Sequence, residues 1–90
     1  MNTAFLLMAQ YQGLAVIPVS LVVKDYFPHI TPDKFLRKVA MGDIGLPLVR
    51  VDPKSEKGAR GVHLADLAKY LDERREAAQK ETRQLTGAPG

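Results

Sequence analysis

The first 23 residues contain no charged side chain, and this limits how the chain can fold. Two apolar runs, Ala4–Ala9 and Leu14–Val19, lie in this stretch, with Gln10, Gln12 and Gly13 between them. Neither run approaches the roughly 20 apolar residues that a membrane-spanning helix needs. No Lys or Arg precedes them, as it would in a secretory signal peptide. We therefore expect this stretch to be buried within a folded domain or against a second copy of the chain, with no membrane partner.

Length and composition predict one small domain. The 90 residues can bury a modest core, and we assign residues 1–84 to a single domain and residues 85–90 to a flexible tail. The chain has no cysteine, which excludes a disulfide framework, a thiolate zinc site and a cysteine nucleophile. The lack of disulfides fits a protein of the cytoplasm.

The N-terminal part predicts two helices around a brief strand. Thr3–Tyr11 is typical of a short helix that Gly13 ends, although a strand is an alternative for so short an apolar run. Val16–Ile17 can form a strand, and Pro18 suits the first turn of a second helix that continues to Tyr26. We expect the buried side chains of this second helix to be Leu21, Val22 and Tyr26.

A break at Phe27–Ile30 separates the second helix from a third one. Thr31 is a good N-cap for residues 32–41, which begin with proline, and Gly42 closes the helix. Pro28-His29 stands where helix-turn-helix proteins commonly have a glycine, so we expect a longer or differently angled turn. The residues predicted to face inward are Phe35, Leu36, Val39 and Ala40.

The C-terminal half predicts a β-hairpin followed by a long helix. Leu46–Val51 and Gly61–Leu64 are the expected strands, and the segment between them is rich in turn residues. Leu64–Gln84 then forms one helix, whose predicted buried face contains Leu64, Leu67 and Leu71. A mainly α chain with a small hairpin in this order has the layout of a winged helix-turn-helix domain.

Basic residues gather in the middle of the chain. The formal net charge is +3, and the whole excess lies in Lys24–His63. The predicted helix 32–41 can fit the DNA major groove, and the basic hairpin after it can follow the phosphate backbone or enter the minor groove. A solvated polar face is the alternative interpretation of the same charges. The candidate DNA-binding residues are Thr31, Lys34, Arg37 and Lys38 on the helix, with Arg50, Lys54, Lys57, Arg60 and His63 on the hairpin.

Catalysis has little support in the sequence. His29 and His63 are the only histidines, and they show no metal-ligand spacing. Ser20 and Ser55 lie near no obvious base, and no glycine loop for phosphate is present. We therefore expect no enzyme activity, no metal and no cofactor.

Most of the chain resembles one family of regulators. The run from Thr3 to Arg83 is similar to the pyocin activator protein family, PrtN. The resemblance is carried by Phe5–Tyr11, Ala15–Pro18, Asp25–Phe27, Arg37–Val39, Leu46–Pro53 and Arg60–Arg75. A looser similarity links the chain to phage excisionases and to the DNA-binding heads of mercury-resistance-type regulators. The positions that fit this second pattern are Gly42, Leu46-Pro47, Arg60 and Asp66-Leu67.

The family resemblance implies a transcription activator. Its expected partner is double-stranded DNA, in boxes upstream of bacteriocin genes derived from phage tails, and RNA polymerase is a further candidate partner. We expect a homodimer in the cytoplasm, associated with the nucleoid, because two-fold dimers suit paired DNA half-sites. Two alternatives are an excisionase-like protein that bends DNA and an adaptor that binds another protein through its apolar N-terminal segment.

Overall fold

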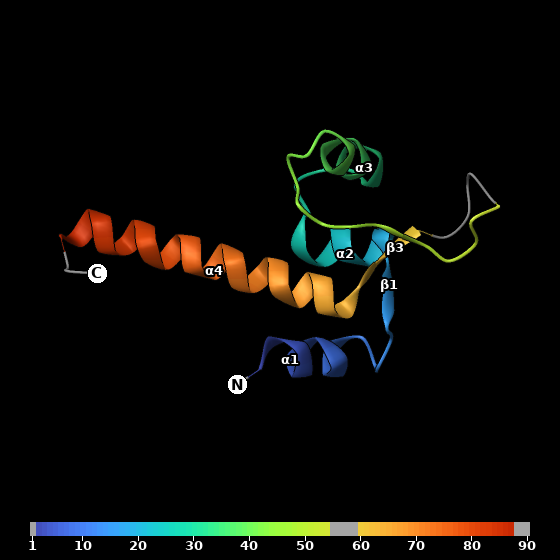
Figure 1. The fold of residues 1–90 in the computed structure, drawn as a ribbon, viewed down its shortest axis with the longest axis horizontal. Helices are drawn as coiled ribbons and strands as arrows, with labels where there is room; N and C mark the ends of the chain where they lie inside the picture. Colours follow the sequence, from blue (N-terminus) through green and yellow to red (C-terminus); the bar gives the residue numbers. More distant parts are fainter. Residues whose placement is uncertain (1, 55–59, 88–90) are drawn as a thin grey trace.

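The computed structural model describes residues 2–54 and 60–87. Within these ranges the chain is mainly helical and has a small antiparallel sheet, as the sequence predicts (Figure 1). The elements in chain order are α1 (Thr3–Gln10), β1 (Val16–Pro18), α2 (Val19–Tyr26), α3 (Pro32–Ala40), β2 (Val49–Arg50), β3 (Arg60–His63) and α4 (Leu64–Thr86).

The first apolar run is a helix rather than a strand. The side chain of Asn2 caps α1, because its Oδ1 accepts a hydrogen bond from the backbone N–H of Ala4 at 2.8 Å. Gly13 ends the turn that follows with a left-handed φ of 80°, and its N–H donates to the carbonyl of Met8 at 2.9 Å. Local capping signals at both ends therefore define this helix.

Within this chain, the predicted burial of α1 is seen on one face only. Only the face with Leu7 packs into the core, and α1 lies along the first half of α4 (Figure 1). The hydroxyl of Thr3 donates to Oδ1 of Asp72 at 2.5 Å and fastens the two helices together. Phe5 on the opposite face is 66% exposed, because no other described element covers that side.

The sheet has the strand order β1-β3-β2, and both pairings are antiparallel. The hairpin between β2 and β3 is confirmed, but the pairing of β1 with β3 is a long-range contact that local patterns did not predict. The predicted strand Leu46–Val51 shrinks to Val49–Arg50. Leu46 uses its N–H in a local bond to the carbonyl of Ile44 at 3.0 Å, and Pro47 has no N–H to donate.

Gly61 lies at the centre of the sheet, where β1 and β2 flank β3. It is paired with Pro18 on one side and with Val49 on the other. A Cβ atom at this position would lie 2.5 Å from a side-chain carbon of Val16 and 2.7 Å from the carbonyl oxygen of Ile17. Only glycine therefore allows β1 to approach β3 this closely.

Helix α2 begins one residue later than predicted. Pro18 ends β1 and occupies the N-cap position, outside the first helical turn. The buried set also differs, because Val19, Val22 and Val23 face the core. Only Val22 was predicted correctly; Leu21 is exposed and Tyr26 is half-buried.

The turn between α2 and α3 spans residues 27–31 and packs on the core through one aromatic ring. The Phe27 ring lies 5.1 Å from that of Phe35 on α3 and 6.1 Å from that of Tyr70 on α4. These tilted contacts suit aromatic pairs. Phe27 therefore holds three elements together, and the largest fully buried side chains surround the same centre: Leu7, Ile17, Val22, Phe35, Val62 and Leu67.

The last helix starts directly at the end of the sheet. His63 ends β3 and caps α4, because its Nδ1 accepts a hydrogen bond from the N–H of Ala65 at 3.0 Å. Leu64 and Leu67 are buried and Leu71 is half-buried, as predicted. The helix passes its predicted end at Gln84, and its second half projects beyond the domain (Figure 1). Residues 88–90 of the predicted tail lie outside the described residues.

Candidate nucleic-acid interface

The start of α3 is set by its cap. The hydroxyl oxygen of Thr31 accepts a hydrogen bond from the N–H of Lys34 at 3.2 Å, so this predicted site residue positions the helix. Phe35 anchors the inner face and is fully buried, while Lys34 and Arg37 are exposed. Lys38 is half-buried, and its aliphatic stem is therefore partly covered.

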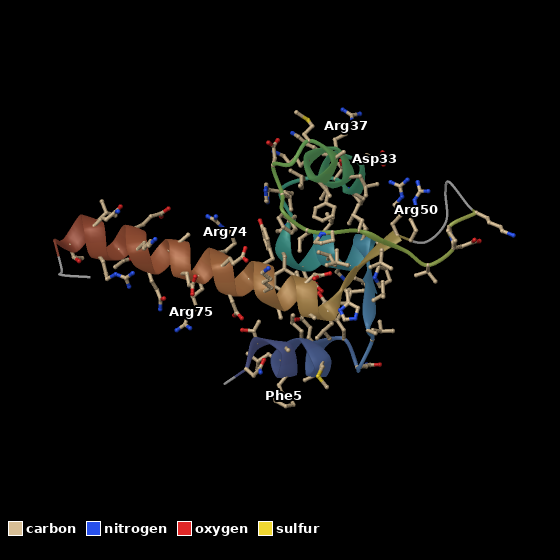
Figure 2. All side chains as sticks on the ribbon, viewed as in Figure 1. Phe5, Asp33, Arg37, Arg50, Arg74 and Arg75 are labelled. Atoms are coloured by element: carbon tan, nitrogen blue, oxygen red, sulfur yellow. The ribbon has the colours of Figure 1, made fainter. Side chains whose placement is uncertain are left out.

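The exposed face of α3 includes three residues that were not predicted as site residues. Asp33 is exposed one helical turn before Arg37, and both side chains project from the outer side of the helix (Figure 2). Ala40 was predicted to face inward, but it is exposed because it lies one turn past Arg37 on that side. Met41 is 75% exposed at the C-cap. These positions could have been found from the sequence by their angular position around the helix, on the side away from buried Phe35.

Two arginines meet across the hairpin. We call β2, β3 and residues 51–54, which follow β2, the wing. Arg50 on β2 and Arg60 on β3 are direct cross-strand partners, so their side chains leave the same face of the sheet. Arg50 is exposed and Arg60 is half-buried. Both were predicted as site residues, and the register brings them side by side.

The remaining predicted wing residues have different positions. Lys54 is exposed, and its N–H donates to Oδ1 of Asp52 at 3.1 Å, which shapes the start of the connection. Lys57 lies outside the described residues. His63 is exposed at the opposite end of β3 from Arg60, and its Nδ1 is engaged in capping α4. Only its other ring nitrogen is therefore available to a ligand.

Helix α3 and the wing lie on the same side of α4, whereas α1 lies on the opposite side (Figure 2). Within the described ranges, the one salt bridge joins Lys69 to Glu73 on α4, at 3.9 Å. Arg37 and Arg50 thus form no ion pair with another described residue, and their charges are available to an anionic partner. This side of the domain presents Arg37 and Arg50, two of the basic residues that were predicted as site residues.

Other kinds of site are not seen in residues 2–54 and 60–87. These residues contain no cluster of three or more acidic, histidine or cysteine side chains that could hold a metal ion. No helix in the described part of the chain combines the length and hydropathy that a membrane crossing needs. The basic residues of α3 and the wing remain the candidate site that the sequence predicts.

The architecture is a small, mainly helical domain with a three-stranded antiparallel sheet, and it is compatible with the winged helix-turn-helix class. The family model described as pyocin activator protein PrtN matches residues 3–78 of the chain. The protein therefore belongs to the pyocin activator protein family, which indicates a transcriptional activator of pyocin genes. No curated protein and no solved structure gave a significant match to the chain.

Proposed function

We propose that the protein is a winged helix-turn-helix activator that binds specific DNA upstream of phage-derived, pyocin-like genes. Helix α3 enters the major groove, and the wing contacts the phosphate backbone or the minor groove. The observation that supports this proposal is that Arg37 and Arg50 are exposed on one side of the domain and have no ion-pair partner among the described residues. Phosphates supply the missing negative charge, and base edges supply specificity.

The exposed residues of α3 support base readout in addition to charge neutralisation. Arg37 has the donors that pair with the two acceptors of guanine, and Asp33 can accept from the amino group of cytosine. Ala40 offers a methyl group to the methyl group of thymine. Lys34 and Lys54 serve best as phosphate contacts, because a lysine ammonium is a point charge without the planar fork of arginine.

Family membership supports the activating role, and the proposed partners follow from it. The protein acts on nucleoid DNA in the cytoplasm, as a homodimer, and contacts RNA polymerase when it is bound upstream of a promoter. The charged second half of α4 projects from the domain, away from α3 and the wing, and is accessible to such a partner (Figure 1).

Selection of bound fragments from genomic DNA, followed by sequencing, tests the proposal. We expect recovery of a shared motif upstream of prophage-type genes, with binding that weakens as salt rises. Arg37→Glu with Lys38→Glu should abolish the footprint. The matched control is Arg74→Glu with Arg75→Glu, which makes the same charge change on exposed residues of α4. Random recovery of fragments, or equal loss of binding in both double variants, would contradict readout by α3.

A further inference from the structure

Helix α1 presents an apolar face that no described part of the chain covers. Phe5, Leu6 and Met8 are 66%, 52% and 45% exposed, whereas Leu7 between them is buried. Ala9 on the same side is also exposed. The Phe5 side chain points away from the domain, on the side of α1 opposite α4 (Figure 2). We call these four exposed side chains the α1 face.

The size of the α1 face is that of an interface centre rather than of scattered surface residues. A complete aromatic side chain offers about 150–250 Å² of surface, and the exposed fractions then give the α1 face roughly 300 Å² of apolar area. The largest apolar patch of a typical monomer is about 300–600 Å² and often serves binding, and the α1 face is at the lower end of that range. A standard interface buries about 800 Å² per partner around a smaller apolar centre with an aromatic anchor. The α1 face with Phe5 fits such a centre.

We propose that the α1 face joins two copies of this chain. A two-fold interface brings each surface against itself, so a charged surface would face its own charge. The first 23 residues carry no charged side chain, so the α1 face itself brings no like charges together. The same lack of Lys and Arg excludes DNA as the occupant, because phosphate binding requires positive charge. An uncharged apolar helix face can therefore pack on its own copy without charge repulsion, and that copy is the partner we assign to it.

The position of the α1 face determines how the two DNA-binding sides are directed, and this step rests on the proposed function. The face lies on the opposite side of α4 from α3 and the wing (Figure 2). A two-fold axis that turns the α1 face onto itself has to lie within the plane of that face. The same rotation turns α3 of the second copy to the opposite outer side. The dimer thus binds two separate duplex segments, one on each side, rather than adjacent half-sites on one duplex.

Sedimentation equilibrium of the full chain tests the interface. The wild type should be a dimer, and Phe5→Glu or Leu6→Lys should weaken dimerisation by about thirtyfold or more, the scale of a lost anchor. The control is Leu85→Glu, because Leu85 is an apolar residue on α4 with 87% exposure, outside the α1 face. Circular dichroism checks that each variant is folded. A monomeric wild type, or a Phe5→Glu variant and a Leu6→Lys variant that both remain dimers, would overturn the proposal.

Capture of a second duplex tests the arrangement. An immobilised duplex carrying the selected motif is loaded with protein, washed and exposed to a fluorescent copy of the same duplex. The wild type and Leu85→Glu should retain the label, and Phe5→Glu should bind the first duplex yet lose most of the capture. A wild-type dimer that occupies one duplex with both copies and captures no second duplex would refute the opposed arrangement. A dimer that needs Phe5 but binds no duplex would support the interface and sink the proposed function instead.

Discussion

Arg50 on β2 lies directly opposite Arg60 on β3, so two guanidinium groups leave the same face of a two-residue strand pair. Like charges at directly opposed positions destabilise a sheet by a few tenths to about 1 kcal/mol. Neither arginine has an ion-pair partner among the described residues. An anion placed between them would remove the repulsion, which makes this pair the strongest indication of phosphate binding in the wing.

Arg50→Gln should therefore change binding and stability in opposite directions. The free energy of unfolding should rise by about 0.2–1 kcal/mol, because the repulsion across the strands is removed. DNA affinity should fall for all sequences alike. The slope of the logarithm of the binding constant against the logarithm of salt concentration should become shallower by about 1. Urea denaturation and fluorescence anisotropy with labelled duplexes measure the two effects. Arg74→Gln on α4 serves as the charge-matched control, and a parallel fall of stability and affinity in Arg50→Gln would contradict this interpretation.

Asp33 and Arg37 should contribute to DNA recognition in different ways. Arg37→Ala should reduce discrimination between the selected motif and a single-base variant by about 1–3 kcal/mol. Asp33→Asn removes a negative charge from the DNA-facing side of α3, so we expect tighter binding to random DNA and weaker discrimination. Competition binding against matched and mismatched duplexes measures both. Equal losses for all sequences in Arg37→Ala would show a phosphate contact instead of base readout.

Gly61→Ala should destabilise the fold. The added Cβ would lie 2.7 Å from the backbone carbonyl oxygen of Ile17, so β1 and β3 have to move apart. Overpacking of this kind costs about 1–3 kcal/mol. Gly45→Ala is the matched control, because a Cβ at Gly45 meets nothing within 4 Å. Thermal denaturation followed by circular dichroism gives the comparison, and similar melting temperatures for the two variants would disprove the close approach of the strands.

Stability should fall in alkaline solution because of Tyr11. Burial raises the pKa of the Tyr11 hydroxyl, and so do its hydrogen bond to Asp25, 2.7 Å long, and the charge of that carboxylate. A raised pKa in the folded state means that the unfolded chain loses this proton first, near the usual tyrosine pKa of about 10. The stabilisation is therefore complete below about pH 10 and is lost as pH rises further.

Tyr11→Phe tests this alkaline effect. At neutral pH the variant should lose about 1.5 kcal/mol of unfolding free energy, the lower end of the range for a hydrogen bond to a charged group. Above about pH 10 its stability should decline less steeply than that of the wild type. Tyr26 contributes to the same decline, because burial also raises its pKa, with the Asp25 charge adding to the shift and its hydrogen bond to Gln10 opposing it. Identical pH profiles for wild type and Tyr11→Phe would argue against the role of Tyr11.

Local signals predicted most of the helices, because caps and breakers act within one turn of chain. Thr31 followed by proline defines the start of α3, and the cap bond to Lys34 is present in the structure. The β1–β3 pairing was missed because Val16 and His63 are paired in the sheet although they lie far apart in the sequence. Short local patterns do not determine which strands pair, or in which register. The later start of β2, at Val49, follows from Pro47, because proline has no N–H to donate to a neighbouring strand.

The candidate site was predictable as a set of residue types but not as a geometry. Lys34 and Arg37 are exposed on α3 as expected, since a strong periodicity places them away from buried Phe35. The opposition of Arg50 and Arg60 required the register of the sheet, which sequence alone did not supply. The apolar character of α1 predicted that its exposed face would be covered. Apolar character alone does not show whether the same chain or another one covers it.

The wing and the long helix are joined directly, because β3 passes straight into α4. His63 belongs to the strand and also caps the helix, so no loop separates the two elements. At 1.5 Å per residue, the 23 residues of α4 extend about 35 Å. A tilt of the wing by about 5° on DNA would then swing the far end of α4 by roughly 3 Å, a distance that can make or break a side-chain contact. If the two elements move together, we expect the seating of the wing on DNA to change where the tip of that helix lies.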